Sequence, residues 1–266
     1  EAIGMAEAPA AALRRRPEAS VAMAAAEVAA GRADAFYSAG HTGATVVAAY
    51  GHLRMIDGVD RPALAATIPT RQGSAVLLDV GATVGCKPQH LVQFARMGTV
   101  FARLALGVEA PRVGLLSIGE EESKGNRLTR GAHRLLKTSG LNFTGNIEAR
   151  DVYASTADVI VCDGFTGNIA LKVSEGLAEM VGEVLRQALR AGEPEGPGVE
   201  LIRKFQKRVD HSEYGGVPLL GLAGLAVVGH GRSSAAAVRN GIAMACRYAA
   251  AGVVLRIRQD ISTTGV

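Results

Sequence analysis

The chain has 266 residues, of which 48% are hydrophobic and 20% are charged, a globular composition that excludes disordered and fibrous proteins. Its formal net charge is +4, and only 4% of its residues are aromatic, so we expect no nucleic-acid partner. The three cysteines, Cys86, Cys162 and Cys246, form no CxxC pair, which is typical of a reducing compartment. We expect all three to be ordinary buried residues.

Neither a targeting signal nor a membrane span is predicted. Residues 35–53 lack charged side chains but include several polar ones, and residues 214–229 are shorter than the ~20 apolar residues that a span requires. The sequence therefore predicts a soluble protein.

Glycine is abundant, with 33 residues, and the glycines follow short apolar runs. After an N-terminal loop and a helix over 20–30, five such runs predict strands, each followed by a glycine-containing loop and a helix. The predicted strands span residues 33–38, 75–80, 112–118, 158–162 and 225–228, and the helices after them end near His52, Leu106, Lys137, Arg190 and Ala251. Continuously apolar strands that alternate with helices predict an α/β fold, a mostly parallel sheet with helices on both faces.

Three further segments have simple interpretations. Residues 192–198 (GEPEGPG) predict a surface turn, and residues 201–209 (LIRKFQKRV) predict a basic, amphipathic helix on the surface. The acidic residues 120–122 precede a predicted helix, where negative charge would complement the helix dipole.

Two loops with similar sequences follow strands of the predicted sheet, at residues 38–43 (SAGHTG) and 163–168 (DGFTGN). Ligands of parallel sheets bind beyond the carboxyl ends of the strands, and the free N–H groups of a helix start favour anions. For either loop alone, a tight turn with a capping threonine is the simpler interpretation, but two such loops on one sheet favour an anion site. The candidate phosphate- or substrate-binding residues are Ser38, Gly40, His41, Thr42, Gly43, Asp163, Gly164, Thr166 and Gly167.

Asn168 and Lys172 are the candidate catalytic residues. Their spacing of four places them on one face of the predicted helix, with Lys172 close enough to the helix start to reach an anion bound there. The sequence contains no Walker A, GxGxxG, HExxH or GxSxG motif, so a nucleotide cofactor, a metal site and a serine nucleophile are not predicted.

Eight ordered segments resemble the bacterial phosphate acyltransferase family, the acyl-ACP:phosphate transacylases, where ACP is acyl carrier protein. The segments lie at residues 38–44 (SAGHTGA), 78–88 (LDVGATVGCKP), 111–126 (PRVGLLSIGEEESKGN), 145–151 (GNIEARD), 158–172 (DVIVCDGFTGNIALK), 174–177 (SEGL), 212–221 (SEYGGVPLLG) and 229–234 (GHGRSS). The resemblance implies a fold similar to that of phosphotransacetylases and the isopropylmalate dehydrogenase group.

The same resemblance implies the reaction acyl-ACP + phosphate → acyl-phosphate + ACP, with no cofactor and no metal. It also implies a cytoplasmic homodimer that associates with the inner face of the membrane, where a glycerol-3-phosphate acyltransferase uses the acyl-phosphate. Basic residues 14–16 or 201–209 are expected to receive the acidic carrier protein.

The chain differs from the family pattern at three places. His41 stands where the family usually has Asn, the hydrophobic segment before SEYGG is reduced to residues 192–209, and the family's opening strand with its DAMGGD loop is absent. We therefore expect residues 1–266 to form a single α/β catalytic domain that is N-terminally incomplete relative to the family. The alternatives are a related oxidoreductase, disfavoured by the missing cofactor fingerprint, and a catalytically impaired fragment with a dimerisation or scaffold role in lipid synthesis.

Overall fold

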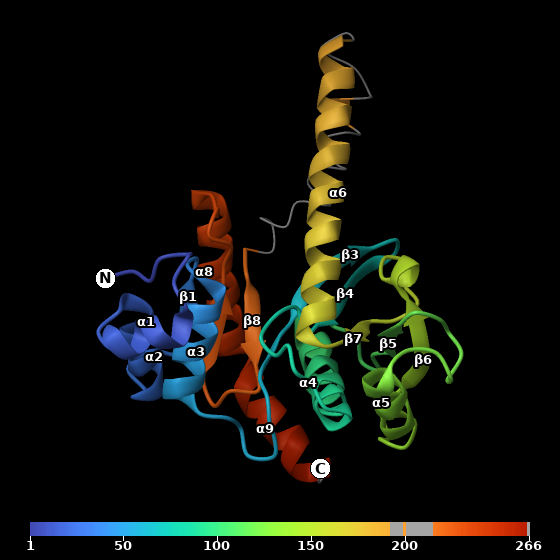
Figure 1. Cartoon of the computed structure of the whole chain (residues 1–266), viewed down its shortest axis with the longest axis horizontal. Coiled ribbons are helices and arrows are strands. Elements are labelled where there is room, and N and C mark those ends of the chain that lie inside the picture. The colour runs from blue at the N-terminus through green and yellow to red at the C-terminus, as the bar shows by residue number, and fades with distance from the viewer. Residues whose placement is uncertain (192–198, 201–214, 265–266) are drawn as a thin grey trace.

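The computed structural model describes residues 1–191, 199–200 and 215–264, in which the strands form two sheets (Figure 1). The first sheet has the order β1 (Ala35–Ser38), β9 (Leu225–Val228), β8 (Val217–Leu220), β2 (Ala63–Leu64). The second has the order β3 (Ala66–Thr70), β4 (Gly73–Leu78), β7 (Val159–Val161), β5 (Val113–Ser117), β6 (Phe143–Glu148). The helices are α1 (Pro9–Arg15), α2 (Ser20–Ala29), α3 (Thr42–Leu53), α4 (Pro88–Leu106), α5 (Arg127–Lys137), α6 (Gly164–Ala191), α8 (Ala235–Ala250) and α9 (Val253–Thr264).

The five predicted strands are confirmed as β1, β4, β5, β7 and β9, and the five helices after them as α3, α4, α5, α6 and α8. Where these five strands pair with one another, they do so in parallel, as predicted. Each antiparallel pair includes β2, β3 or β8, which the sequence analysis missed together with β6, α1 and α9. The fold is therefore α/β, with mixed sheets whose parallel part was predicted.

The placement of the two Gly-rich loops on one sheet was wrong. The loop over 38–43 follows β1 of the first sheet, whereas the loop over 163–168 follows β7 of the second. Only Ala65 separates β2 from β3, so the chain passes directly from one sheet to the other, and the two halves lie side by side (Figure 1).

The central strands, such as β7 and β9, are buried on both faces, and successive residues contribute to two different core clusters. Val76 and Leu78 of β4 pack in the cluster that contains α4, α8 and α9, whereas Leu77 packs in the cluster that contains α3. β9 alternates in the same way, with Val227 in the first cluster and Val228 in the second. Because each cluster includes residues of both sheets, apolar packing joins the two halves on both sides.

Two smaller expectations were wrong, and others lie outside the described residues. The acidic residues 120–122 do not complement the start of α5, because that helix begins only at Arg127, capped by Asn126; Glu122 instead pairs with Lys137 in the last turn (3.2 Å). Of the three cysteines expected to be buried, only Cys162 is; Cys86 is partly buried and Cys246 is exposed. The predicted turn over 192–198 and the basic helix over 201–209 fall outside the described ranges. Among the helices within those ranges, none is both long and apolar enough to cross a bilayer.

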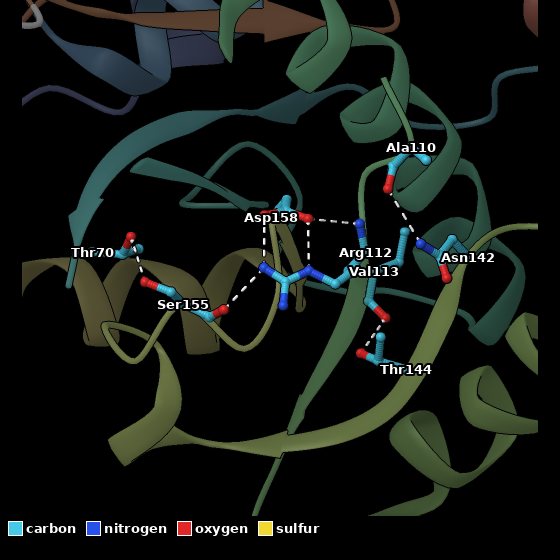
Figure 2. Close-up of polar contacts among 8 residues, drawn as sticks. All are labelled: Thr70, Ala110, Arg112, Val113, Asn142, Thr144, Ser155 and Asp158. Atoms are coloured by element: carbon cyan, nitrogen blue, oxygen red, sulfur yellow. Dashed lines mark hydrogen bonds and ion pairs between the residues drawn. The ribbon is translucent and has the colours of Figure 1, made fainter. Parts of the chain in front are cut away.

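An ion pair fixes the amino ends of β5 and β7 (Figure 2). Arg112 donates from Nε and from one terminal nitrogen to the two oxygens of Asp158, each at 3.0 Å, and its backbone N–H donates to Asp158 at 2.9 Å. The same guanidinium also donates to the carbonyl of Ser155 (2.9 Å), whose hydroxyl donates to Thr70 (3.0 Å). The network thus ties β3, β5 and β7 together at the edge opposite the Gly-rich loops.

We expect Asp158→Asn to destabilise the protein by about 1–2 kcal/mol at pH 7, because a charge-assisted, partly exposed pair is lost. Burial raises the pKa of Asp158, but the hydrogen bonds and charge of Arg112 outweigh it, so the pKa lies below its ordinary value. A carboxyl group whose pKa is lower in the folded than in the unfolded protein stabilises the folded state at pH values above its unfolded pKa, which is near 4. This stabilisation is lost as the pH falls through the folded-state pKa.

Urea unfolding of wild type and variant at pH 7 and at pH 3 measures this difference, which should shrink at the lower pH. Asp57→Asn, at an exposed position, is the matched control and should change stability little at either pH. An equal Asp158→Asn effect at both pH values would contradict the assignment.

Candidate active site

A cleft of about 830 Å³ lies between the two halves, where β1 and β9 of the first sheet and β4 of the second reach their carboxyl ends. One wall comes from α6 between Asn168 and Glu179 and from residues 80–81. The other comes from the start of α3, from residues 215–217, and from residues 228–237, which lead into α8. The half with the second sheet therefore contributes one side of α6 to the cleft, and the half with the first sheet contributes the starts of α3 and α8.

The start of α6 is capped by its own aspartate. Asp163 accepts hydrogen bonds from the backbone N–H groups of Phe165 (3.0 Å) and Thr166 (3.1 Å) and from the Thr166 hydroxyl (2.7 Å). The Gly164 N–H donates to the carbonyl of Thr83 (3.0 Å). These donors are already used within the chain, so residues 163–166 stabilise the helix start.

The two glycines of this segment lie against the loop that follows β4. A Cβ atom at Gly167 would collide with the carbonyl oxygen of Asp79, and one at Gly164 would lie 2.6 Å from the Asp79 carboxylate. Glycine is therefore required at both positions because α6 approaches the backbone of residues 79–83 closely.

Asp79 is fully buried, and its carboxylate accepts four backbone N–H groups. Oδ1 accepts from Leu64 (2.8 Å), Gly81 (3.0 Å) and Ala82 (3.0 Å), and Oδ2 accepts from Thr83 (2.6 Å). Burial raises the pKa of Asp79, while the four donors oppose the shift by stabilising the anion. Asp79 was not among the predicted site residues, although a single carboxylate in the apolar run AVLLDV was a visible signal.

The loop over 38–43 is shaped by internal hydrogen bonds. Nδ1 of His41 accepts the N–H of Gly43 (3.1 Å), so the imidazole caps α3 and carries its ring proton on Nε2 when neutral. The hydroxyl of Thr45 donates to the hydroxyl of Ser38 (3.0 Å), and the Ser38 carbonyl accepts from Gly229 (2.8 Å). His41 can thus make the acceptor contact that an asparagine cap would make, while Thr42 and Gly43 face the cleft.

The loop after β9 has the same construction and was not among the predicted site residues. Nδ1 of His230 accepts from Arg232 N–H (3.1 Å), and the Ser234 hydroxyl accepts from Ala237 N–H (3.2 Å), which caps α8. His230, Arg232, Ser233, Ser234 and Ala237 all line the cleft. The signal was present in the sequence, because GHGRSS follows a predicted strand as the two selected loops do.

Four predicted residues line the cleft: Thr42, Gly43, Asn168 and Lys172. The others are not among its described lining residues: Ser38, Gly40, His41, Asp163, Gly164, Thr166 and Gly167.

The cleft combines cations from both halves with hydrogen-bond donors. Lys172 comes from α6 and Arg232 from the loop before α8, and neither forms an ion pair within the described part of the chain. Glu175 and Glu179 line the α6 wall further along the helix. Two cations beside the starts of α3 and α8 can bind an anion and stabilise negative charge that develops next to it. The described residues contain no group of three or more His, Cys, Asp or Glu side chains that could hold a metal ion.

Comparison with known proteins agrees with this architecture. The family model described as "Fatty acid synthesis protein" matches residues 1–256. The phosphate acyltransferase of Geobacter sulfurreducens is 46% identical over 267 residues, which cover 99% of this chain and 77% of that protein. The phosphate acyltransferase of Desulforudis audaxviator is 49% identical over 249 residues, which cover 92% of this chain and 74% of that protein.

Solved structures with a similar fold are phosphotransacylases. A phosphotransacetylase from Streptococcus pyogenes has a TM-score of 0.55 and 17% identity, with 91% of this chain and 67% of that chain covered. A branched-chain phosphotransacylase from Enterococcus faecalis has a TM-score of 0.52 and 15% identity, with 87% and 79% covered. These similarities establish the fold, as the sequence resemblance predicted.

The curated relatives define the class of protein: it is an acyl-transferring enzyme. With 46% identity over nearly its whole length, the chain belongs to the phosphate acyltransferase family, as the eight sequence segments indicated.

We expect Gly167→Ala to lower the free energy of unfolding by about 1–3 kcal/mol, because the new methyl group is forced against the Asp79 backbone. Gly182→Ala, in the same helix with open space at Cβ, is the control and should stabilise by about 0.5–1 kcal/mol. Chemical unfolding measures both. Equal stabilities would show that Gly167 is not held by this close approach.

Proposed function

We propose that the protein transfers an acyl group from acyl-ACP to inorganic phosphate, giving acyl-phosphate and free ACP for phospholipid synthesis. The observation that carries the proposal is the meeting, in one cleft of a phosphate acyltransferase family member, of Lys172 and Asn168 with the starts of α3 and α8. The arrangement suits an anionic nucleophile and a developing oxyanion.

In the proposed reaction, a phosphate oxygen attacks the thioester carbonyl carbon and the carbonyl oxygen becomes an oxyanion. The tetrahedral intermediate then collapses, the carbon–sulfur bond breaks, and the carrier leaves as a thiolate that takes a proton from water. Because phosphate is itself the nucleophile, the enzyme needs no serine or cysteine nucleophile, cofactor or metal for this step. Its task is to hold phosphate against the carbonyl and stabilise the oxyanion.

Asn168 and Lys172 are the proposed catalytic residues. They lie on consecutive turns of one face of α6, and both line the cleft. The ammonium group of Lys172 neutralises charge on phosphate or oxyanion, and the Asn168 amide donates a hydrogen bond beside Gly81. Thr42 and Gly43 are the proposed substrate contacts of the other half, held in place by Ser38, Gly40 and His41. Asp163, Gly164, Thr166 and Gly167 contribute by fixing the start of α6.

A homodimer is also proposed, and α6 supports it. Large apolar side chains, each about half exposed or more, recur along its length at spacings of three or four: Phe165, Ile169, Val173, Leu177, Met180 and Val184. The helix projects beyond the rest of the described chain (Figure 1), so this apolar stripe is accessible to a second copy. Sedimentation of the purified protein tests the assembly. We place the enzyme in the cytoplasm, at the inner face of the membrane, where a glycerol-3-phosphate acyltransferase would consume its product.

The direct test incubates the protein with acyl-ACP, with and without phosphate, and measures both free thiol and acyl-phosphate. We expect thiol release that requires phosphate and yields acyl-phosphate in equal amount. Thiol release without phosphate would indicate a thioesterase, and no release of either product would favour the scaffold alternative.

We expect Lys172→Met to lower kcat/KM for phosphate by roughly 30- to 1000-fold, about 2–4 kcal/mol of transition-state stabilisation, because one preorganised cation is lost. Lys124→Met, which removes an exposed charge from the loop before α5, is the matched control. An unchanged kcat/KM in the Lys172 variant would contradict its assignment.

A further inference from the structure

The outward face of α8 is basic and carries no acidic residue. The helix packs on β1 and β9 through Gly241, Met244 and Tyr248, which leaves Arg239 and Arg247 on its exposed side. No Asp or Glu occurs in the helix, and between residues 229 and 264 five arginines are accompanied by one acidic residue, Asp260. This segment therefore presents a local positive excess in a chain that is only mildly basic overall.

Several arginines elsewhere in the described chain are already ion-paired within it. Arg16 donates to Glu7, Arg32 to Glu27 and Arg112 to Asp158. In contrast, Arg239 and Arg247 form no ion pair within the described residues, and neither does Arg232 just before the helix. No acidic side chain of the described residues neutralises their charge.

The remaining exposed residues of this face are small or apolar. Between the two arginines the exposed residues are Ala243, Cys246 and Ile242, which is 49% exposed. A solvated helix face is normally rich in both lysine and glutamate, whereas protein interfaces are enriched in arginine and depleted in Lys, Glu and Asp. Short side chains also let a second helix approach closely.

The face begins at the cleft. Ser234, the cap of α8, and Ala237 in its first turn both line the cleft, and Arg232 lies at the same edge. From Arg239 to Arg247 the helix rises by about 12 Å. The three arginines therefore extend outward from the cleft mouth over about two Debye lengths at physiological salt, so a charged partner near one of them is close to the others. A protein bound along α8 would have its reactive group next to the site of acyl transfer.

We propose that the exposed face of α8, with Arg232, Arg239 and Arg247, is the docking surface for an acidic protein that carries the acyl thioester. The proposal rests on the proposed function and adds the place where the donor binds. It is an alternative to residues 14–16 and 201–209, the docking residues expected from the sequence; of these, Arg16 is already paired with Glu7. A second copy of this chain is a poorer occupant, because symmetric contact through α8 would bring arginines together without an acidic residue between them.

The kinetic test uses the double variant Arg239→Glu/Arg247→Glu and two donors. The donors are acyl-ACP and an acyl-pantetheine thioester, which has the reactive arm without the acidic protein. We expect KM for acyl-ACP to rise roughly tenfold or more with little change in kcat, and the parameters for acyl-pantetheine to stay unchanged. The matched control is Arg127→Glu/Arg134→Glu on α5, in the other half of the molecule, where both arginines are exposed.

The outcomes separate this proposal from the proposed function. If wild type releases no thiol from either donor in a phosphate-dependent way, the proposed function fails. If wild type is active and the α8 and α5 variants have the same KM for acyl-ACP, the docking surface is wrong. An equal rise in KM for both donors would also contradict it, because the effect would then lie in the cleft.

A binding readout independent of turnover is available through Cys246, which is exposed on the same face. Burial raises the pKa of Cys86 to about 12, and Cys162 is buried, so a maleimide at neutral pH reacts selectively at Cys246. A photo-crosslinker there should capture ACP at low salt, and should not do so in high salt or in the Arg239→Glu/Arg247→Glu protein. Failure to capture ACP, or equal capture of a DNA oligonucleotide, would overturn the proposal.

Discussion

The buried carboxylate of Asp79 accepts backbone N–H groups from both halves of the molecule. Leu64 belongs to β2 of the first sheet, whereas Gly81, Ala82 and Thr83 follow β4 of the second. A buried charge without hydrogen-bond donors is costly, so all four amides must stay in place around it. The side chain thereby fixes how the end of one sheet meets the end of the other, and its own backbone supplies the surface against which Gly167 packs.

The cleft depends on this junction. With the first turn of α6 seated on residues 79–83, Asn168 and Lys172 reach the cleft on the next turns of the same helix. The half with the first sheet supplies the starts of α3 and α8, which are held by side-chain caps from His41 and Ser234. The proposed phosphate site is thus formed between the two halves, and the basic face of α8 leads away from it toward solvent.

Much of this arrangement was predictable because it depends on local pattern. Five strands were found since burial on both faces makes them continuously apolar, and Asn168 and Lys172 were found from their spacing behind a helix start. β2 was missed because its two residues form no pattern, and β8 because Pro218 is unusual inside a strand; their antiparallel pairing was missed with them. Gly164 and Gly167 were predicted to bind phosphate. A closely bound phosphate and a closely packed protein backbone both require a residue without a Cβ atom, so the sequence pattern is the same for either. Only the structure shows that here it is Asp79 that packs against these two glycines.

The most direct test of the Asp79 junction is native-state hydrogen exchange of the backbone amides in Asp79→Ala compared with wild type. The account predicts faster exchange at Leu64 in one half and at residues 81–83 and 164–167 in the other, with β6 unchanged. Acceleration confined to residues 81–83, with Leu64 and the start of α6 as protected as in wild type, would contradict it.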